Sequence, residues 1–475
     1  MANLTIVDDN AFVVGALDRV FVFLRQAQNM VELTQCGNNT ETSPQSNGAT
    51  TNSDGVENTG RCNSTGSENR TDDNDIIPTP TTSDVQCLCC AVSKVDAQPE
   101  TSSNCYHVAA AFNDRRVVIW RLTIDRNQNG EFGNVRKERM CAIELPKQAT
   151  KLVFDSDSNL IVSDRFGSVH RFCSLESKSV SSDDGKLNDD DCDDSDDVIA
   201  KQNGQTILGH LSMVLDLHFA QIEHQSSRKN VLISCDRDEK IRISHYPNCY
   251  NVHAYCLAHR SYVRSIDTLS FGDQRTLIIS IDGQNMVRLW DLVNAQCLAW
   301  HQIENDNNGS QLPVKIIGNQ VGDRTALVCV AMANKPLVLV LKLTTSAGDV
   351  STPAYKWSEM QRVQLRQPED NDAAIIGAWD AAFDRARTLW VLPRVNKCVK
   401  PDVCLQSFTF DNTTFTFIAQ PSASICAEFN SKLALLLPLV RNELPSLDKV
   451  TCYDNMPKYM ERKEERLMAK KQKLG

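Results

Sequence analysis

A repeated pattern, in which a polar turn leads into a short apolar run, constrains the fold of this chain more than any other feature. The pattern occurs at residues 113–120, 164–169, 236–244 and 287–291. Short runs rich in Val, Ile and Leu that end in turn residues are typical of β-strands. His210 and His259 precede two of these segments and lie 49 residues apart, close to the period of about 40–45 residues of propeller blades with Gly-His and Trp-Asp signatures.

A single four-stranded sheet has two faces to cover, and it can bury them only against neighbouring sheets arranged in a ring. The sequence therefore predicts an all-β fold, a seven-bladed WD40 β-propeller over residues 1–455. In such blades a His, a Ser or Thr, a turn Asp and a Trp share buried hydrogen bonds. We expect structural roles of this kind for His210, His259, Trp120, Trp290 and Asp291.

The repeats are degenerate at two places. We expect the turn carboxylate of one repeat at Asp238; in the next repeat Gln284 stands there, with Asp282 two places earlier. Ser244 stands where the other repeat has Trp290.

The remaining blades are assigned more loosely. Residues 10–14 and 20–23 are expected to form inner strands of the first blade, and residues 425–440 to supply its missing strand and close the ring. Later blades are expected at residues 325–330 with 337–340 and at 379–383 with 388–392.

Two insertions and a basic tail interrupt or follow this pattern. Residues 37–85 are rich in Asn, Thr, Ser and Gly, and residues 175–204 contain long runs of Asp. Both are predicted to be disordered, because they cannot bury enough apolar surface to offset the entropy lost on ordering. Together the two insertions carry a larger negative charge than the net charge of −10 of the entire chain. The remaining, folded part is therefore close to neutral. Residues 456–475 are predicted to form a basic amphipathic helix, which starts near Asn455 and Pro457.

Motifs for chemistry are missing from the sequence. It has no phosphate-binding loop, dinucleotide fingerprint or metalloprotease motif. Cys87 and Cys90 form one C-x-x-C pair, but no second pair follows at the spacing of a structural zinc site. We expect no metal, no cofactor of its own and no catalytic residue.

The cysteines and the hydropathy indicate the compartment. The 18 cysteines are scattered and lie mostly in apolar runs, such as those around Cys141, Cys235, Cys256 and Cys329. We therefore expect reduced, buried thiols in a cytosolic or nuclear protein. No apolar run approaches the length of about twenty residues that a membrane span requires, and the N-terminus lacks a signal-peptide pattern.

Several segments resemble the WD-repeat, non-catalytic subunit of tRNA (guanine-N(7)-)-methyltransferase, and its Wuho members in particular. The segments are residues 208–216, 234–244, 256–263, 453–455 and 461–467. The resemblance implies a seven-bladed propeller that binds a separate Rossmann-type subunit. That partner would hold S-adenosylmethionine and methylate N7 of a guanine in the tRNA variable loop.

The resemblance also implies a partner-binding site on one charged turn. Asp238, Glu239, Lys240 and Arg242 would face the catalytic subunit through salt bridges. From its own position in the turn of the neighbouring blade, and not from the resemblance, Arg165 would extend this surface. From the residues alone, alternating charges on a tight turn can fix a partner in register. A solvated turn without a function is the alternative interpretation of the same pattern.

The basic tail suggests a second contact. Lys463, Arg466, Lys470 and Lys471 could meet tRNA phosphates in a salt-sensitive manner, or they could be a solvated terminus. Basic residues at 470–473 also suggest location in the nucleus, with the cytoplasm as a further site. The competing function is a general WD40 interaction scaffold unrelated to tRNA methylation; an enzyme in its own right is the least favoured interpretation.

Overall fold

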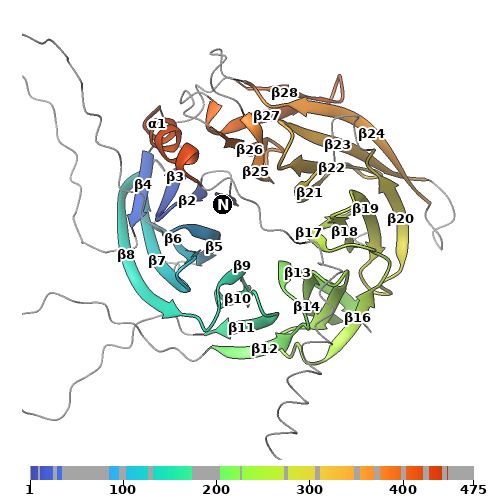
Figure 1. Cartoon of the computed structure of the whole chain (residues 1–475), viewed down its shortest axis with the longest axis horizontal. Coiled ribbons are helices and arrows are strands. Elements are labelled where there is room, and N and C mark those ends of the chain that lie inside the picture. Colours follow the sequence, from blue (N-terminus) through green and yellow to red (C-terminus); the bar gives the residue numbers. More distant parts are fainter. Residues whose placement is uncertain are drawn as a thin grey trace, which may run out of the picture.

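The computed structural model describes the blades of a ring and one helix (Figure 1). The described residues are 2–8, 11–24, 29–34, 85–95, 103–126, 132–173, 204–224, 227–271, 276–304, 311–346, 354–367, 375–396, 403–420, 427–440 and 447. The predicted tail over 456–475 lies outside this set, and so do the two predicted insertions apart from Val85 and Gly204.

Seven four-stranded antiparallel sheets form the ring, each built from four consecutive strands. We number them blades 1 to 7 along the chain. Blade 1 contains β1 (Asn3–Asp8), β2 (Ala11–Ala16), β3 (Arg19–Leu24) and β4 (Asn29–Thr34); blade 2 contains β5 (Cys87–Val95), β6 (Ser103–Phe112), β7 (Arg116–Arg126) and β8 (Phe132–Glu144); blade 3 contains β9 (Ala149–Phe154), β10 (Leu160–Asp164), β11 (Ser168–Phe172) and β12 (Gln205–Gly209); blade 4 contains β13 (Val214–His224), β14 (Ser227–Asp236), β15 (Ile241–His245) and β16 (Val252–Cys256). Blade 5 contains β17 (Val263–Ser270), β18 (Thr276–Asp282), β19 (Met286–Asp291) and β20 (Cys297–Gln302); blade 6 contains β21 (Pro313–Gly322), β22 (Thr325–Met332), β23 (Leu337–Thr345) and β24 (Tyr355–Gln364); blade 7 contains β25 (Ile375–Phe383), β26 (Leu389–Val395), β27 (Gln406–Asp411) and β28 (Thr416–Ala419). The predicted seven-bladed all-β propeller is confirmed.

Position within a blade decides how apolar a strand is. The first strand of each blade lies nearest the ring axis and the fourth lies at the rim (Figure 1). The second strands are buried on both faces over most of their length, as in β22 and β26, because the neighbouring blades cover them. The rim strand β20 is largely exposed. Continuous Val, Ile and Leu runs therefore mark the second and third strands, which explains why the sequence revealed these strands most clearly.

The prediction that residues 425–440 supply a strand of the first blade is wrong. Blade 1 already has four strands, since β4 pairs with β3 along its length. The segment instead forms helix α1 (Ala427–Leu436) and the short 3₁₀ helix η3 (Leu437–Leu439). Its Ala, Glu, Lys and Leu residues favour a helix, and no open strand edge is left for it in blade 1.

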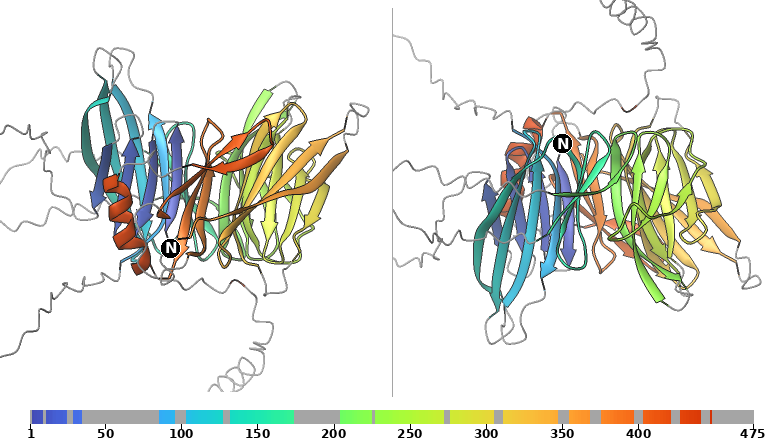
Figure 2. Two further views of the ribbon diagram at one scale, coloured as in Figure 1. Left: turned by 90° about the horizontal axis from the view of Figure 1, so that it is seen from above. Right: turned by 90° about the horizontal axis from the view of Figure 1, so that it is seen from below.

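Two kinds of contact close the ring between blades 7 and 1. Near the axis, the backbone N–H of Leu4 in β1 donates to the Asp380 carboxylate in β25, at 3.1 Å. On the outside, α1 lies against blade 1 (Figures 1 and 2). Phe429 of α1 packs on Phe21 and Phe23, with ring centroids 6.4 and 5.3 Å away. The helix thus helps to cover the apolar side of the closing seam.

We expect Phe429→Ala to lower the free energy of unfolding by about 3–5 kcal/mol, because it leaves a cavity among the rings of Phe21 and Phe23. Urea unfolding followed by circular dichroism measures the loss. Leu435→Ala, in the same helix but 73% exposed, is the matched control and should change stability by less than about 0.5 kcal/mol. If Phe429→Ala lowers the free energy of unfolding no more than Leu435→Ala does, the packing of Phe429 does not stabilise the seam.

Candidate functional site

A buried hydrogen-bond network in blade 5 joins a loop, two strands and a turn. The indole N–H of Trp290 donates to Ser280 Oγ at 2.8 Å, and His259 Nε2 lies 2.7 Å from the same hydroxyl. His259 Nδ1 lies 2.8 Å from Asp282 Oδ2. Burial lowers the pKa of His259, so its ring is neutral at pH 7 and Nε2 can accept the Ser280 proton. His259 and Trp290 thus share buried hydrogen bonds of the kind expected for structural blade residues.

Blade 4 repeats this network without the tryptophan. His210 Nδ1 lies 2.9 Å from Asp236 Oδ2, and Nε2 lies 2.7 Å from Ser234 Oγ. The turn carboxylate is therefore Asp236, and the prediction that Asp238 fills this role is wrong by two residues.

The same shift applies in blade 5. Asp282 is the equivalent turn carboxylate, so the expected departure at Gln284 does not exist. Trp120 is buried in the apolar cluster between blades 1 and 2. Asp291 accepts from the backbone N–H groups of Val293 and Asn294 at 2.7 and 3.0 Å, which fixes the turn after β19.

The charged turn between β14 and β15 is organised by Asp236. Its Oδ1 accepts from the backbone N–H groups of Asp238 and Lys240, at 2.9 and 3.1 Å. Although burial opposes ionisation, the hydrogen bond from His210 and these backbone donors lower the pKa of Asp236. Glu239 sits at φ 72° in the left-handed region, which is costly for a residue with a side chain. The shape of this turn is thus imposed from the blade interior.

Arg242 is not on the surface with the other predicted partner-binding residues. It is only 8% exposed, and its guanidinium donates to Ser244 Oγ, Gly209 O and Cys249 O at 2.9, 3.1 and 2.7 Å. These bonds tie β15 to the end of β12 in blade 3 and to the turn before β16. The expectation of an Arg242 side chain facing a partner does not match this geometry, because the small Ser244 leaves the guanidinium room inside the blade.

Arg165 lies on the turn between β10 and β11, and its guanidinium donates to Gln148 Oε1 at 2.8 Å. The loop between β12 and β13 connects this turn to the charged turn of blade 4. The N–H of His210 donates to Gly167 O at 2.8 Å, and the N–H of Arg237 donates to Met213 O at 2.9 Å. Arg165, Asp238, Glu239 and Lys240 therefore belong to one continuous face, which we call the turn face.

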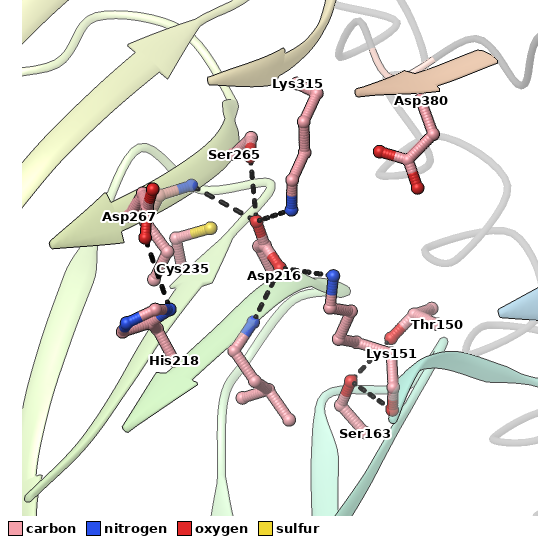
Figure 3. Close-up of polar contacts among 12 residues, drawn as sticks. Thr150, Lys151, Ser163, Asp216, His218, Cys235, Ser265, Asp267, Lys315 and Asp380 are labelled. Atoms are coloured by element: carbon pink, nitrogen blue, oxygen red, sulfur yellow. Dashed lines mark hydrogen bonds and ion pairs between the residues drawn. The ribbon is translucent and has the colours of Figure 1, made fainter. Parts of the chain in front are cut away.

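A buried ionic cluster near the ring axis was missed by the sequence reasoning (Figure 3). Asp216 in β13 is 3% exposed. Its carboxylate lies 3.1 Å from Lys151 Nζ in blade 3 and 3.6 Å from Lys315 Nζ in blade 6, and it accepts from Ser265 Oγ in blade 5 at 2.8 Å. Burial alone would raise the pKa of Asp216, but the two ammonium groups and the Ser265 hydrogen bond hold it far below its usual range.

The cluster could not be found from sequence, because its members are 65 and 99 residues from Asp216 and no local spacing links them. The cluster has a structural role, because it links different blades near the ring axis. Both ammonium groups pair with the one carboxylate of Asp216, and the three residues join inner strands of different blades.

Most of the described thiols are buried, although Cys173 and Cys297 are exposed. Cys141, Cys235, Cys256 and Cys329 are free and buried, and burial raises the pKa of Cys141 to about 11. The Sγ atoms of Cys87 and Cys90 lie 3.4 Å apart inside blade 2. Within the described ranges, no group of three or more His, Cys, Asp or Glu side chains could hold a metal ion.

The predicted RNA contacts of the basic tail and the expected lack of a membrane span are the remaining predictions. Lys463, Arg466, Lys470 and Lys471 lie outside the described residues. Among the helices that are described, none has the length and apolar character needed to cross a bilayer.

Comparisons with known proteins confirm the predicted resemblance. Residues 188–384 match the family model described as tRNA methyltransferase TRM82 WD40 domain. This stretch includes all of blades 4, 5 and 6 and the charged turn of the turn face.

Relatives with a similar sequence come from several organisms. The chain is 26% identical over 273 residues to the tRNA (guanine-N(7)-)-methyltransferase non-catalytic subunit wdr4 of Dictyostelium discoideum, a match that covers 56% of this chain and 52% of that protein. It is 25% identical over 283 residues to the subunit named wuho in Aedes aegypti, covering 58% and 60% of the two chains. It is 34% identical over 139 residues to wuho of Drosophila erecta, covering 29% and 30%. The matched part thus spans 52% and 60% of the length of the first two relatives.

We expect Asp216→Asn to cost about 3 kcal/mol of stability, because it removes the buried carboxylate that pairs with the partly buried ammonium groups of Lys151 and Lys315. The pKa of Asp216 is lower in the folded chain than in the unfolded one. Its contribution is therefore complete above about pH 5 and is lost as the pH falls through and below about 4. Urea unfolding at several pH values should show a smaller decline on acidification for the variant.

Asp157→Asn is the control for this experiment, since Asp157 is exposed and should matter by less than about 0.5 kcal/mol. If Asp216→Asn is as stable as the wild type at pH 7, the cluster does not have the structural role that we assign to it.

Arg242→Met keeps an unbranched apolar stem but removes the guanidinium and its donors. We expect a loss of about 1–3 kcal/mol, because the carbonyl oxygens of Gly209 and Cys249 lose a buried donor. Thermal unfolding measures it. Arg288→Met, at the matching position of blade 5, is the control: Arg288 donates to the Cys297 thiol at 3.5 Å and should cost under about 1 kcal/mol. If Arg242→Met leaves the melting temperature unchanged, the guanidinium is not a structural tie.

Proposed function

We propose that this chain is the non-catalytic scaffold subunit of a tRNA (guanine-N(7)-)-methyltransferase. The observation that carries the proposal is the match of residues 188–384 to the TRM82 WD40 domain. Relatives from three organisms, named non-catalytic subunits of this methyltransferase, support it. The role would be to bind, stabilise and orient a separate catalytic subunit for m7G formation in the tRNA variable loop.

The turn face is the surface that we assign to the catalytic subunit. It carries cations at Arg165 and Lys240 and anions at Asp238 and Glu239. Opposite charges placed side by side on one surface select one register of docking and raise the association rate. The turns are held by Asp164 and Asp236 from inside their blades, so the charges are already in place before a partner arrives. Arg242 would contribute by holding blades 3 and 4 together rather than by direct contact.

S-adenosylmethionine would be held by the catalytic subunit, so the scaffold itself needs no cofactor and no catalytic residue. tRNA would reach the complex mainly through the catalytic subunit. Lys463, Arg466, Lys470 and Lys471 would add phosphate contacts that weaken as salt rises. We place the complex in the nucleus, with the cytoplasm as a further site.

We expect the double variant Arg165→Glu, Lys240→Glu to bind the purified catalytic subunit on the order of 10- to 100-fold more weakly than the wild type, because like charges then face the partner. Calorimetric titration measures the affinity, and digestion of tRNA followed by mass spectrometry measures m7G in cells that carry the variant, where it should fall.

Lys229→Glu is the matched control for this charge reversal. Lys229 is exposed and lies in β14, the strand that leads into the charged turn, but about 23 Å away at its other end. The Lys229→Glu variant should bind the catalytic subunit with the affinity of the wild type. Normal m7G after complete removal of the chain would overturn the proposal and favour a general interaction scaffold.

A further inference from the structure

Two large apolar side chains stand exposed on the turn face. Phe166 is 65% exposed and Leu211 is 98% exposed. Single exposed apolar residues are common on protein surfaces, but these two belong to segments in direct contact. A Cβ atom on Gly167 would lie 2.5 Å from the carbonyl oxygens of both His210 and Ser212. The loop that carries Leu211 therefore lies against the turn that carries Phe166.

The backbone of both segments is fixed from inside the blades. Asp164 Oδ1 accepts from the N–H groups of Phe166 and Ser168 at 2.8 and 3.0 Å. Gly167 adopts φ 96°, which glycine tolerates and other residues rarely do. On the other segment, the His210 ring is held by Ser234 and Asp236, directly before Leu211. An anchor held in this way loses little entropy on binding.

Charged groups surround the apolar pair. Lys147 Nζ lies 4.5 Å from the centroid of the Phe166 ring, and Arg165 lies beside Phe166 in the same turn. On the other side, the N–H of Arg237 bonds to Met213 O, which brings the turn with Asp238 and Glu239 next to the loop of Leu211. A desolvated apolar centre inside a polar rim is the usual composition of a specific protein–protein interface.

We propose that Phe166 and Leu211 form the apolar anchor of this interface and insert into an apolar hollow of the catalytic methyltransferase subunit. The inference rests on the proposed function and goes further, since it names the side chains that supply affinity, whereas the surrounding charges set register. A protein occupant fits better than RNA. Phe166 carries a ring on which a base could stack, but Leu211 does not, and the carboxylates of Asp238 and Glu239 would repel phosphates.

The test is a binding titration of the purified full chain with the purified catalytic subunit. We expect Phe166→Ala and Leu211→Ala each to raise Kd on the order of 10-fold and the double variant on the order of 100-fold. The melting temperature should stay unchanged, because both side chains are exposed. Trp300→Ala is the matched control: Trp300 is 61% exposed but lies on the rim strand β20 of blade 5, and its loss should leave Kd within about twofold of the wild type.

The outcomes separate this inference from the proposed function. If the wild-type chain binds the catalytic subunit and the double variant binds equally well, the anchor is disproved and the scaffold function stands. If the wild-type chain does not bind at all, both proposals fail. If the double variant binds the subunit normally but loses affinity for tRNA in a filter-binding assay, the surface serves RNA and the inference is wrong.

Discussion

A four-stranded sheet leaves two apolar faces that it cannot cover, and in this chain neighbouring sheets must cover them. The ring therefore depends on contacts that hold different blades in a fixed arrangement near its axis. Asp216 brings together Lys151, Ser265 and Lys315, which come from blades 3, 5 and 6. Because the carboxylate is buried, a blade arrangement that moves either lysine away leaves Asp216 with less compensation for a charge that water cannot easily reach. This makes the cluster selective for one arrangement of blades, even though a buried ion pair need not add much net stability.

Buried carboxylates also determine the shape of the turns that lie on the turn face. Asp164 and Asp236 are needed to end a strand and begin the next, and the hydrogen bonds with which they do so also hold Phe166, Asp238 and Lys240 in place. The surface that we assign to the partner is thus a direct extension of the blade interior. A scaffold of this kind can present a rigid, charged face without any catalytic machinery of its own.

Closure of the ring shows how local preference and long-range contact combine. Asp380 and Leu4 join the inner strands of blades 7 and 1, while α1 covers the outside of blade 1 with Phe429. A strand shared between the two ends of the chain can close such a ring, and the sequence predicts this strand at residues 425–440. The structure uses a helix because blade 1 takes all four of its strands from the first part of the chain.

The sequence by itself determined the blade texture, the polar turns and the histidines that precede blades 4 and 5, because strands, turns and repeats are set by residues close together along the chain. It even located the charged turn that the structure places on the turn face. Only the tertiary structure decided that Asp236 rather than Asp238 is the turn carboxylate, that Arg242 is inside the blade, and that blade 1 leaves no open strand edge for residues 427–436, which follow their local helical preference. It also created the Asp216 cluster. Each of these depends on which distant groups are near enough to bond, and spacing along one chain carries no information about that distance.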